Sequence, residues 1–175
     1  CLMTAQIANG GYKIKPKILV DNDPLTHEKA KKAMKEQSLN TSNNQLFRNQ
    51  ENIKIVQKAM FSSTNEIYGT SYKSRIEDPK YQFAGKTGTA QVKRLSKRER
   101  ELDLKINQIP YKDRDHALYI AYGPYVNPRY ALSIIVEHGG SGSRAAAPMA
   151  KEIFKLLIDR DELREQQPNL EPVNI

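Results

Sequence analysis

The clearest hydrophobic pattern lies in the second half of the chain, where two apolar runs are separated by a short turn. The first run, residues 116–125, is almost continuously apolar and ends at Gly123-Pro124, and residues 129–138 repeat this pattern. Runs of this length bounded by glycine and proline are typical of buried strands. An earlier stretch, 82–92, combines β-branched and aromatic residues with glycines at positions 85 and 88. It predicts a third strand, with another part of the backbone approaching closely at both glycines.

Two helices are predicted in the first half of the chain. The opening sequence CLMTAQIA is followed by Asn-Gly-Gly at 9–11, which is a typical helix C-terminal signal. In residues 51–61, Ile53, Val56 and Met60 recur at helical spacing. This periodicity predicts an amphipathic helix whose apolar stripe packs against a core.

The last strong pattern predicts a closing helix over residues 144–159. Pro148 falls in its first turn, where a helix tolerates proline. The predicted apolar face is formed by Met149, Ile153, Leu156 and Leu157. We expect this face to pack on the sheet.

Weaker patterns occupy the connections. Residues 12–20 alternate and contain Pro16, which predicts an edge strand. Residues 27–37 favour a helix without a good apolar stripe, and 96–107 begin with a capping box and predict a surface helix. The order of strand, long excursion, strand, tight turn, strand and helix predicts an antiparallel meander closed by a C-terminal helix. The fold class is therefore α+β.

Composition adds a net charge of +8 over 175 residues, with 38% hydrophobic content. The charge is concentrated at 93–100 and in a lysine cluster within 29–35, but few aromatic residues lie near either block. A single-strand nucleic-acid binder needs such stacking partners, so we expect no nucleic-acid partner. Cys1 is the only cysteine, so no internal disulfide can form, and no apolar run is long enough to span a bilayer. A chain that opens inside a helix is expected to be part of a longer protein.

Several kinds of active site can be set aside from the residues alone. A phosphate-binding loop around Gly85-Lys86-Thr87 would need a glycine where Lys80 stands and a helix directly afterwards. Ser141 lies between glycines but lacks the final glycine of a nucleophile elbow. The three histidines have no metal-ligand spacing, and we expect neither a metal nor a cofactor; they are His27, His116 and His138.

The sequence Lys86-Thr87-Gly88 matches the Lys-Thr-Gly element of the serine penicillin-recognising enzymes. On an edge strand, an acyl-peptide substrate can pair with the backbone, and Gly88 leaves room for it. Lys86 and the hydroxyls of Thr87 and Thr89 can donate to a substrate carboxylate, and the Thr89 amide can help to stabilise an oxyanion. The tripeptide alone is weak evidence, since chance produces it in about one chain in ten of this length.

Longer segments make the case more specific. The sequences TAQIANGGYKIKPKIL, AGKTGTAQV and HALYIAYGPYVNPRYALSIIVEHGGSGSRAAAPMAKEIF resemble the C-terminal half of the class B penicillin-binding transpeptidases. The resemblance implies a β-lactamase/transpeptidase-like fold over 1–160, followed by a polar tail at 161–175. Within that fold, 82–92 would be the third strand, lining the active site, and 116–125 and 129–138 the fourth and fifth. The implied activity is peptidoglycan cross-linking through a serine acyl-enzyme, with stem peptides as substrates and β-lactams as inhibitors. The implied location is the periplasmic face of the inner membrane, with the anchor outside this chain.

The family's nucleophile element, Ser-x-x-Lys, does not occur at any serine of the chain. Two literal Ser-x-Asn matches occur, at 42–44 and 63–65. Both lie downstream of the opening helix, whereas the family's element lies upstream of it, so we interpret both as chance matches. The chain is thus expected to supply Lys86, Thr87, Gly88 and Thr89 for substrate binding but no catalytic nucleophile. By itself it should be inactive.

Two alternatives stay open. A β-lactamase or penicillin sensor also carries Lys-Thr-Gly, although the charged excursion at 93–115 favours the transpeptidases. A non-catalytic module could instead use the basic block at 93–100 to bind an acidic partner. In the implied fold, the strand at 129–138 pairs with a strand from the N-terminal part of the domain, outside this chain. Without that strand, residues 129–138 would offer an unpaired edge, which predicts self-association there.

Overall fold

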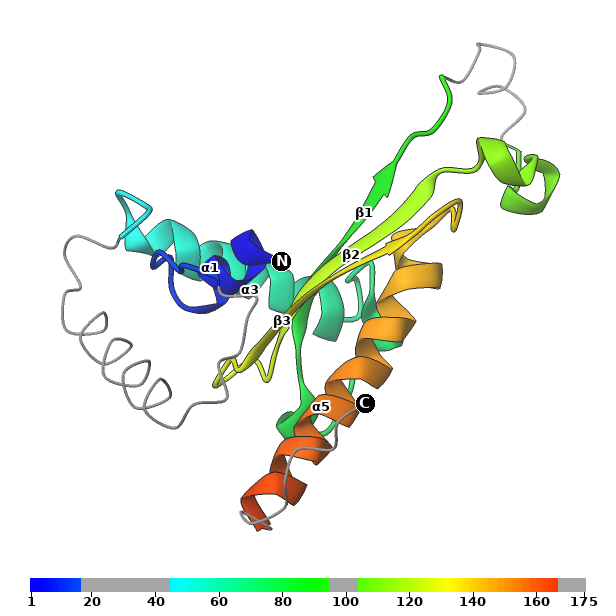
Figure 1. The fold of residues 1–175 in the computed structure, drawn as a ribbon. Coiled ribbons are helices and arrows are strands. Elements are labelled where there is room, and N and C mark those ends of the chain that lie inside the picture. The colour runs from blue at the N-terminus through cyan, green and yellow to red at the C-terminus, as the bar shows by residue number, and fades with distance from the viewer. Residues whose placement is uncertain (17–44, 95–103, 167–175) are drawn as a thin grey trace.

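The fold is an antiparallel sheet between two helical layers in a computed structural model that describes residues 1–16, 45–94 and 104–166 (Figure 1). The strands are β1 (Ala84–Ala90), β2 (His116–Gly123) and β3 (Tyr130–Val136), in the order β1-β2-β3. Both pairs are antiparallel. The predicted meander is confirmed, and each strand is shorter than its predicted range because pairing stops before the flanking turn residues.

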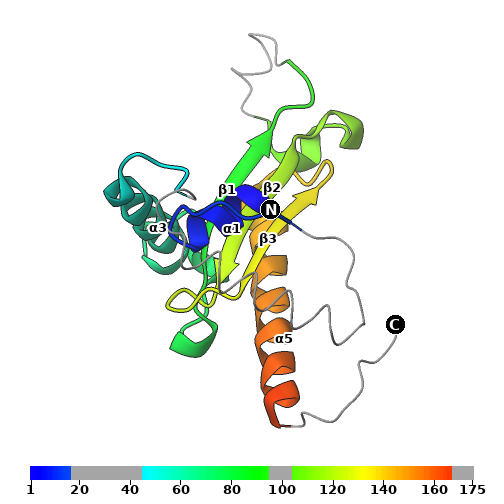
Figure 2. The same cartoon turned by 60° about the vertical axis from the view of Figure 1, so that its left-hand side comes forward.

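One face of the sheet is covered by α5 (Ala147–Gln166), which follows a single π-helical turn at Gly142–Ala146. Phe154 is fully buried and stacks on Phe83 with ring centroids 4.9 Å apart. Alternate residues of β2, Tyr119 and Ala121, complete this core. Figure 2 shows the C-terminal half of α5 extending past the sheet.

The apolar face predicted for the closing helix is wrong. Met149 and Leu156 are 50% and 70% exposed, and Ile153 is 38% exposed. The buried positions follow the same helical period on another face: Ala147, Ala150, Phe154, Ile158 and Asp161. Alanines let the helix backbone approach the sheet closely. Small residues therefore occupy the buried face of this helix, and larger leucine and methionine side chains lie outside it.

The closing helix also extends beyond its predicted end. It continues through Gln166, so the expected boundary at 160/161 falls inside α5. Asp161 is buried, accepts a short hydrogen bond from the Tyr130 hydroxyl, and pairs with Arg129 at 3.0 Å. This contact connects α5 beyond residue 160 to Tyr130 of β3.

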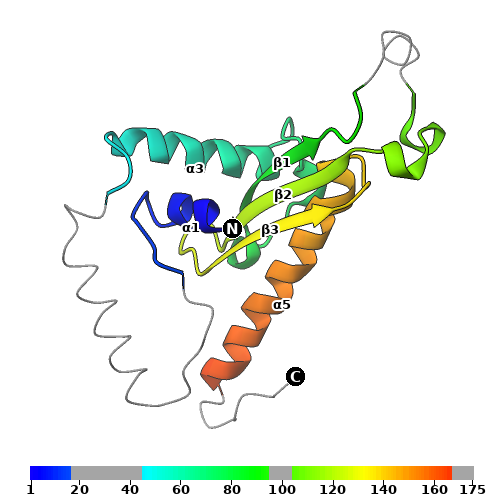
Figure 3. The same ribbon diagram turned by 45° about the horizontal axis from the view of Figure 1, so that its top comes forward.

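The opposite face of the sheet is covered by α1 (Leu2–Ala8) and α3 (Gln50–Asn65), as Figure 3 shows. The predicted end of α1 is confirmed: Asn9 caps the helix, and the two glycines after it have positive φ angles of 88° and 90°. Met60 packs with Ala84 and Tyr122 in the core beneath these helices.

The predicted stripe on α3 is only partly right. Ile53 and Met60 are buried, but Val56 is 39% exposed. The inward position is Gln57, whose side-chain amide donates to the carbonyl of Ile7 at 2.7 Å. Gln57, a polar residue that binds the end of α1, therefore faces inward in place of the predicted apolar residue, Val56.

The connections differ from expectation where they are described. Residues 106–108 and 111–113 form 3-10 turns, so the predicted helix does not extend over residues 104–107. Tyr12 makes an isolated bridge to Gln45. The rest of the predicted 12–20 strand, from residue 17, and the helices predicted at 27–37 and 96–103 lie outside the described residues. Within residues 1–16, 45–94 and 104–166, every helix is too short or too polar to cross a bilayer.

Candidate substrate-binding strand

All residues of the predicted substrate-binding element lie on one strand, β1, at the edge of the described sheet. Lys86 and Thr89 are exposed, and Thr87 and Gly88 are half-buried. The register pairs Lys86 with Ile120 and Gly88 with Leu118 of β2. The other edge of β1 has no strand partner in the described residues, so its outward backbone groups decide what can pair there.

The first half of that outer edge is already occupied. The amide of Gly85 donates to the Thr64 hydroxyl at 3.1 Å, and the carbonyl of Phe83 accepts from the Asn65 side chain at 2.9 Å. Both partners come from the last residues of α3. In an antiparallel pair, outward-facing groups recur at every second residue. The outward groups after Gly85 are therefore those of Thr87 and Thr89.

The second half of the edge is open. Within the part of the chain that the structure describes, the Thr87 carbonyl accepts only from the neighbouring Lys86 ammonium, at 3.0 Å. No group in the described parts of the chain bonds the backbone amide of Thr89 from the outside. An extended peptide can thus pair with β1 from Thr87 onward, while the end of α3 blocks pairing before it.

Lys86 offers an uncompensated positive charge beside this open edge. Among the described residues, its ammonium bonds the Thr87 carbonyl and, at 3.3 Å, the Thr87 hydroxyl. Within the described residues, no carboxylate lies within ion-pair distance of it. A donor-only group next to a hydroxyl is well suited to bind a carboxylate.

A buried hydroxyl cluster, formed by Thr64, Ser71 and Tyr119, holds the start of β1. The Tyr119 hydroxyl lies 2.9 Å from that of Thr64 and 3.1 Å from that of Ser71. Burial raises the pKa of Tyr119, so its phenol stays protonated and can donate. Gly85 is required here, because a Cβ at this position would lie 2.3 Å from the Tyr119 oxygen. This confirms the close approach predicted at Gly85, although the approaching group is a side chain.

Gly88 is approached closely by the backbone after β3. A Cβ on Gly142, in the π-helical turn, would lie 2.7 Å from the carbonyl oxygen of Gly88 and 2.4 Å from that of Leu118. The turn into α5 therefore packs directly against the backbone of β1 and β2. The Lys-Thr-Gly segment is supported from this side as well as from α3.

Sequence reasoning did not find the hydroxyl cluster. Its only trace in the sequence was the segment 63–65, interpreted above as a chance Ser-x-Asn match. In the structure, Thr64 bonds Gly85 of β1, and Asn65 bonds Phe83, the residue before β1. The other match, 42–44, lies outside the described residues. Polar residues at a helix end, close to a strand that carries a binding motif, were the available signal.

The histidines lie closer together than their separation in sequence suggested. His116 and His138 meet at the ends of β2 and β3, with ring centroids 4.8 Å apart, and the His138 amide donates to the His116 ring at 2.9 Å. Within residues 1–16, 45–94 and 104–166, no three acidic, histidine or cysteine side chains cluster as metal ligands would.

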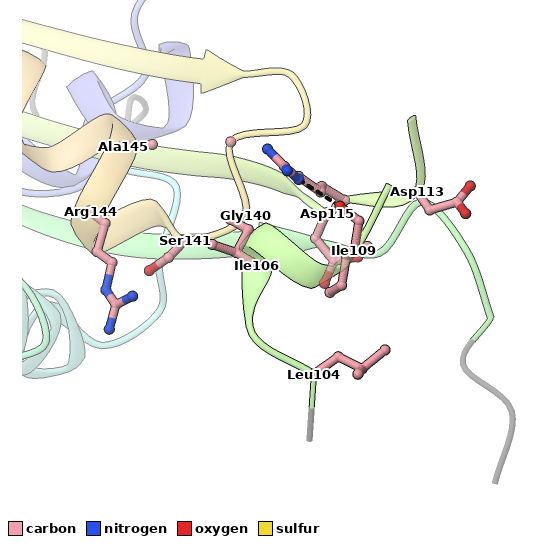
Figure 4. Close-up of a pocket in the computed structure, with 11 residues that line it drawn as sticks. Leu104, Ile106, Ile109, Asp113, Asp115, Gly140, Ser141, Arg144 and Ala145 are labelled. Atoms are coloured by element: carbon pink, nitrogen blue, oxygen red, sulfur yellow. Dashed lines mark hydrogen bonds between the residues drawn. The ribbon is translucent and has the colours of Figure 1, made fainter. Parts of the chain in front are cut away.

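A cavity of about 490 Å³ is lined in part by Asp115 and Gly139, the chain neighbours of these two histidines (Figure 4). Ile106 and Ile109, from the excursion between β1 and β2, line one part of it, and Gly140, Ser141 and Arg144 line another. Ser141 bonds the hydroxyl of Ser143, at 3.0 Å. In the described residues no histidine bonds Ser141, so a paired base is missing here. The open edge of β1 is the better candidate site.

An antiparallel sheet between two helical layers, with Lys-Thr-Gly on its edge strand, is the arrangement expected of the serine penicillin-recognising enzymes. The family model described as the penicillin binding protein transpeptidase domain matches residues 2–155. The chain belongs to this family, and the predicted fold class is confirmed.

Relatives with curated names include the peptidoglycan D,D-transpeptidase MrdA of Salmonella typhimurium, 38% identical over 105 residues, which is 60% of this chain and 16% of that protein. MrdA of Haemophilus influenzae is 34% identical over 120 residues, covering 67% of this chain and 17% of that protein. Matched segments thus span about a sixth of these relatives.

Solved structures agree with this assignment. PBP2 of Pseudomonas aeruginosa, in complex with WCK 5153, aligns with a TM-score of 0.58 and 29% identity over 89% of this chain and 28% of that one. PBP2 of Helicobacter pylori, in a complex with MreC, aligns with a TM-score of 0.52 and 29% identity over 65% of this chain and 18% of that one. These relatives agree with the subgroup that the same sequence segments indicate, penicillin-binding protein 2.

Proposed function

We propose that this chain is the C-terminal part of a peptidoglycan D,D-transpeptidase and that β1 is its substrate-binding strand. In the complete enzyme, a serine outside this chain attacks the D-Ala-D-Ala end of a stem peptide and releases the terminal D-Ala. An amine on a neighbouring peptidoglycan strand then attacks the acyl-enzyme ester, so the acyl group is transferred to the amine as the cross-link and the serine is released. β-Lactams acylate the same serine.

The observation that carries this proposal is the half-open edge of β1. Lys86 and the Thr87 hydroxyl are placed to bind the terminal carboxylate, beside the point where the end of α3 closes the edge. Gly88 gives the substrate clearance, and the outward amide of Thr89 is free to donate to a carbonyl oxygen that becomes negative. The complete enzyme works on peptidoglycan, so we place this domain in the periplasm and its membrane anchor outside this chain.

Labelled penicillin tests whether the nucleophile lies outside this chain, in the rest of the enzyme. We expect no covalent adduct on the 175-residue chain, because it contains no Ser-x-x-Lys, and one adduct per molecule on the full-length polypeptide that carries that element. Intact-mass spectrometry distinguishes the two. An adduct on the short chain contradicts the absence of a nucleophile, and a full-length polypeptide that stays unlabelled contradicts the function.

The alternatives considered for the sequence are less well supported. The matched relatives with curated names are transpeptidases rather than β-lactamases or sensors. A basic binding module would rely on residues 93–100, of which 95–100 lie outside the described residues. Within the described part, Lys93 pairs with Asp113 at 3.8 Å.

We also propose that the isolated chain self-associates through β3, the other edge of the sheet. The Ala131 carbonyl faces outward, since the Cys1 thiol donates to it, and alternation places the backbone groups of Ser133 and Ile135 on the same edge. Ile135 is also 63% exposed. An uncovered edge with an apolar side chain favours pairing with a second copy.

Light scattering and hydrogen exchange on the isolated chain test this association. We expect a concentration-dependent dimer that Ile135→Lys disrupts, because a lysine on an edge strand opposes pairing. Val126→Lys is the matched control, since Val126 is 87% exposed in the β2–β3 turn, and it should dimerise like the parent. A monomer whose Ser133 and Ile135 amides are protected from exchange contradicts the proposal.

A further inference from the structure

A line of hydroxyl groups connects Lys86 to the end of α3. The Lys86 ammonium lies 3.3 Å from the Thr87 hydroxyl, which lies 3.2 Å from the hydroxyl of Thr70. The Thr70 hydroxyl in turn lies 3.2 Å from that of Ser63. Thr70 belongs to the turn after α3, and no role followed for it from the sequence.

The hydrogens in this line can be arranged in two ways. A lysine ammonium only donates, so the Thr87 oxygen accepts from Lys86. Without substrate, the Thr87 hydrogen can point to Thr70, and the Thr70 hydrogen to Ser63. A carboxylate only accepts, so a bound substrate requires the Thr87 hydrogen for itself. Thr70 then reverses and donates to Thr87, which keeps the Thr87 oxygen bonded while its hydrogen faces the substrate.

The backbone holds Thr70 in place for this task. Gly69 packs so closely that a Cβ on it would lie 2.4 Å from the carbonyl oxygen of Ser63. On the other side, the amide of Ser71 donates to that same carbonyl at 3.0 Å, and the Ser71 hydroxyl joins Tyr119 in the buried hydroxyl cluster. Thr70 is thus fixed at both neighbours, yet its own side chain is exposed.

We propose that Thr70 is a positioning residue for substrate binding: its hydroxyl orients the Thr87 hydroxyl toward the terminal carboxylate of the substrate. This inference rests on the proposed function, because it requires that carboxylate to bind beside Lys86 and Thr87. Thr70 itself does not contact the reacting atoms. Its effect should therefore depend on Thr87 and on the carboxylate.

The test compares acylation rates of the full-length polypeptide with a labelled penicillin and with the methyl ester of the same penicillin. Thr70→Val removes the hydroxyl but keeps the shape, and should slow acylation by the free acid about 3- to 10-fold, the loss of one neutral hydrogen bond. The ester lacks the charged acceptor, so its rate should change less than about 2-fold. Thr70→Ser should restore the parental rate.

Two further variants separate positioning from a structural effect. Tyr68→Phe removes a hydroxyl from the same turn at a side chain that is 79% exposed, and should leave both rates unchanged. In a Thr87→Val background, Thr70→Val should have no further effect, because it acts through Thr87. Equal slowing of acid and ester, an additive double variant, or a parental rate for Thr70→Val each overturns the proposal.

The outcome also distinguishes this inference from the proposed function. If Thr87→Val and Lys86→Ala leave acylation by the free acid unchanged, β1 is not the carboxylate-binding strand and the function fails. If those two variants are slow while Thr70→Val reacts like the parent, the function stands and only the role of Thr70 is lost.

Discussion

Replacing Lys86 with alanine should slow acylation of the full-length polypeptide by penicillin about 100-fold, since hydrogen bonds to charged groups contribute up to roughly 3 kcal/mol. Lys86 is exposed and, among the described residues, bonds only Thr87, so its loss should remove the proposed carboxylate partner without disturbing the core. Stopped-flow measurement with a labelled penicillin gives the rate, and thermal unfolding should show a parental midpoint.

Two companion variants sharpen this result. Lys58→Ala removes the same charge from an exposed position on α3 and should react like the parent. Lys86→Arg keeps the charge but replaces a compact ammonium by a planar fork, and should recover only part of the rate. If Lys86→Ala is acylated at the parental rate, Lys86 is not part of the site. If Lys58→Ala slows acylation equally, the effect of Lys86 comes from the overall charge of the protein and not from binding at the site.

Replacing Phe154 with alanine should lower the free energy of unfolding of the 175-residue chain by about 3–5 kcal/mol. The side chain is fully buried and stacks on Phe83, between α5 and the sheet. Urea unfolding followed by circular dichroism measures the change. A loss of this size is a large fraction of the stability of an ordinary domain.

Leu156→Ala on the same helix is the matched control. Leu156 is 70% exposed, so its truncation should change stability by less than about 0.5 kcal/mol. The apolar face predicted from the sequence had Leu156 against the sheet. A larger loss for Leu156→Ala than for Phe154→Ala contradicts the packing of α5 described here.

The strands, and the position of Lys-Thr-Gly on one of them, could be predicted because their signals are local. Apolar runs ended by glycine or proline, such as 116–125, identify buried strands without knowledge of their partners. Lys86 to Thr89 form a short contiguous motif, so its position on an edge strand followed from the strand assignment. The wider family resemblance then supplied the fold.

The faces of the helices could not be predicted as well, because they depend on what packs against them. On α5, Ala150 is fully buried while Met149 is half exposed, although methionine is the more hydrophobic residue. The deciding factor is the close approach of the helix to the sheet, which local sequence does not encode. Gln57 on α3 is similar, since its place facing α1 depends on carbonyls about fifty residues away.

The hydroxyl cluster was missed for a related reason. Thr64 and Ser71 flank one turn, but Tyr119 comes from β2, and only the pairing of β1 with β2 brings it to them. Serine and threonine at the end of a helix have common local roles in turns and caps. The polar residues at this helix end were therefore a weak signal, because they did not identify Tyr119 as their partner.

The closure of one half of the β1 edge gives the strand a direction. An extended chain lying against Thr87 and Thr89 cannot continue past Gly85, because Thr64 and Asn65 already bond the backbone there. An internal segment of a long polypeptide would have to continue past this point, where no backbone group is left for it to pair with. A chain that ends there gives up no backbone pairing. If β1 is the substrate-binding strand as proposed, it therefore selects a free chain end over an internal segment, and the positive charge of Lys86 lies where that end carries its negative charge.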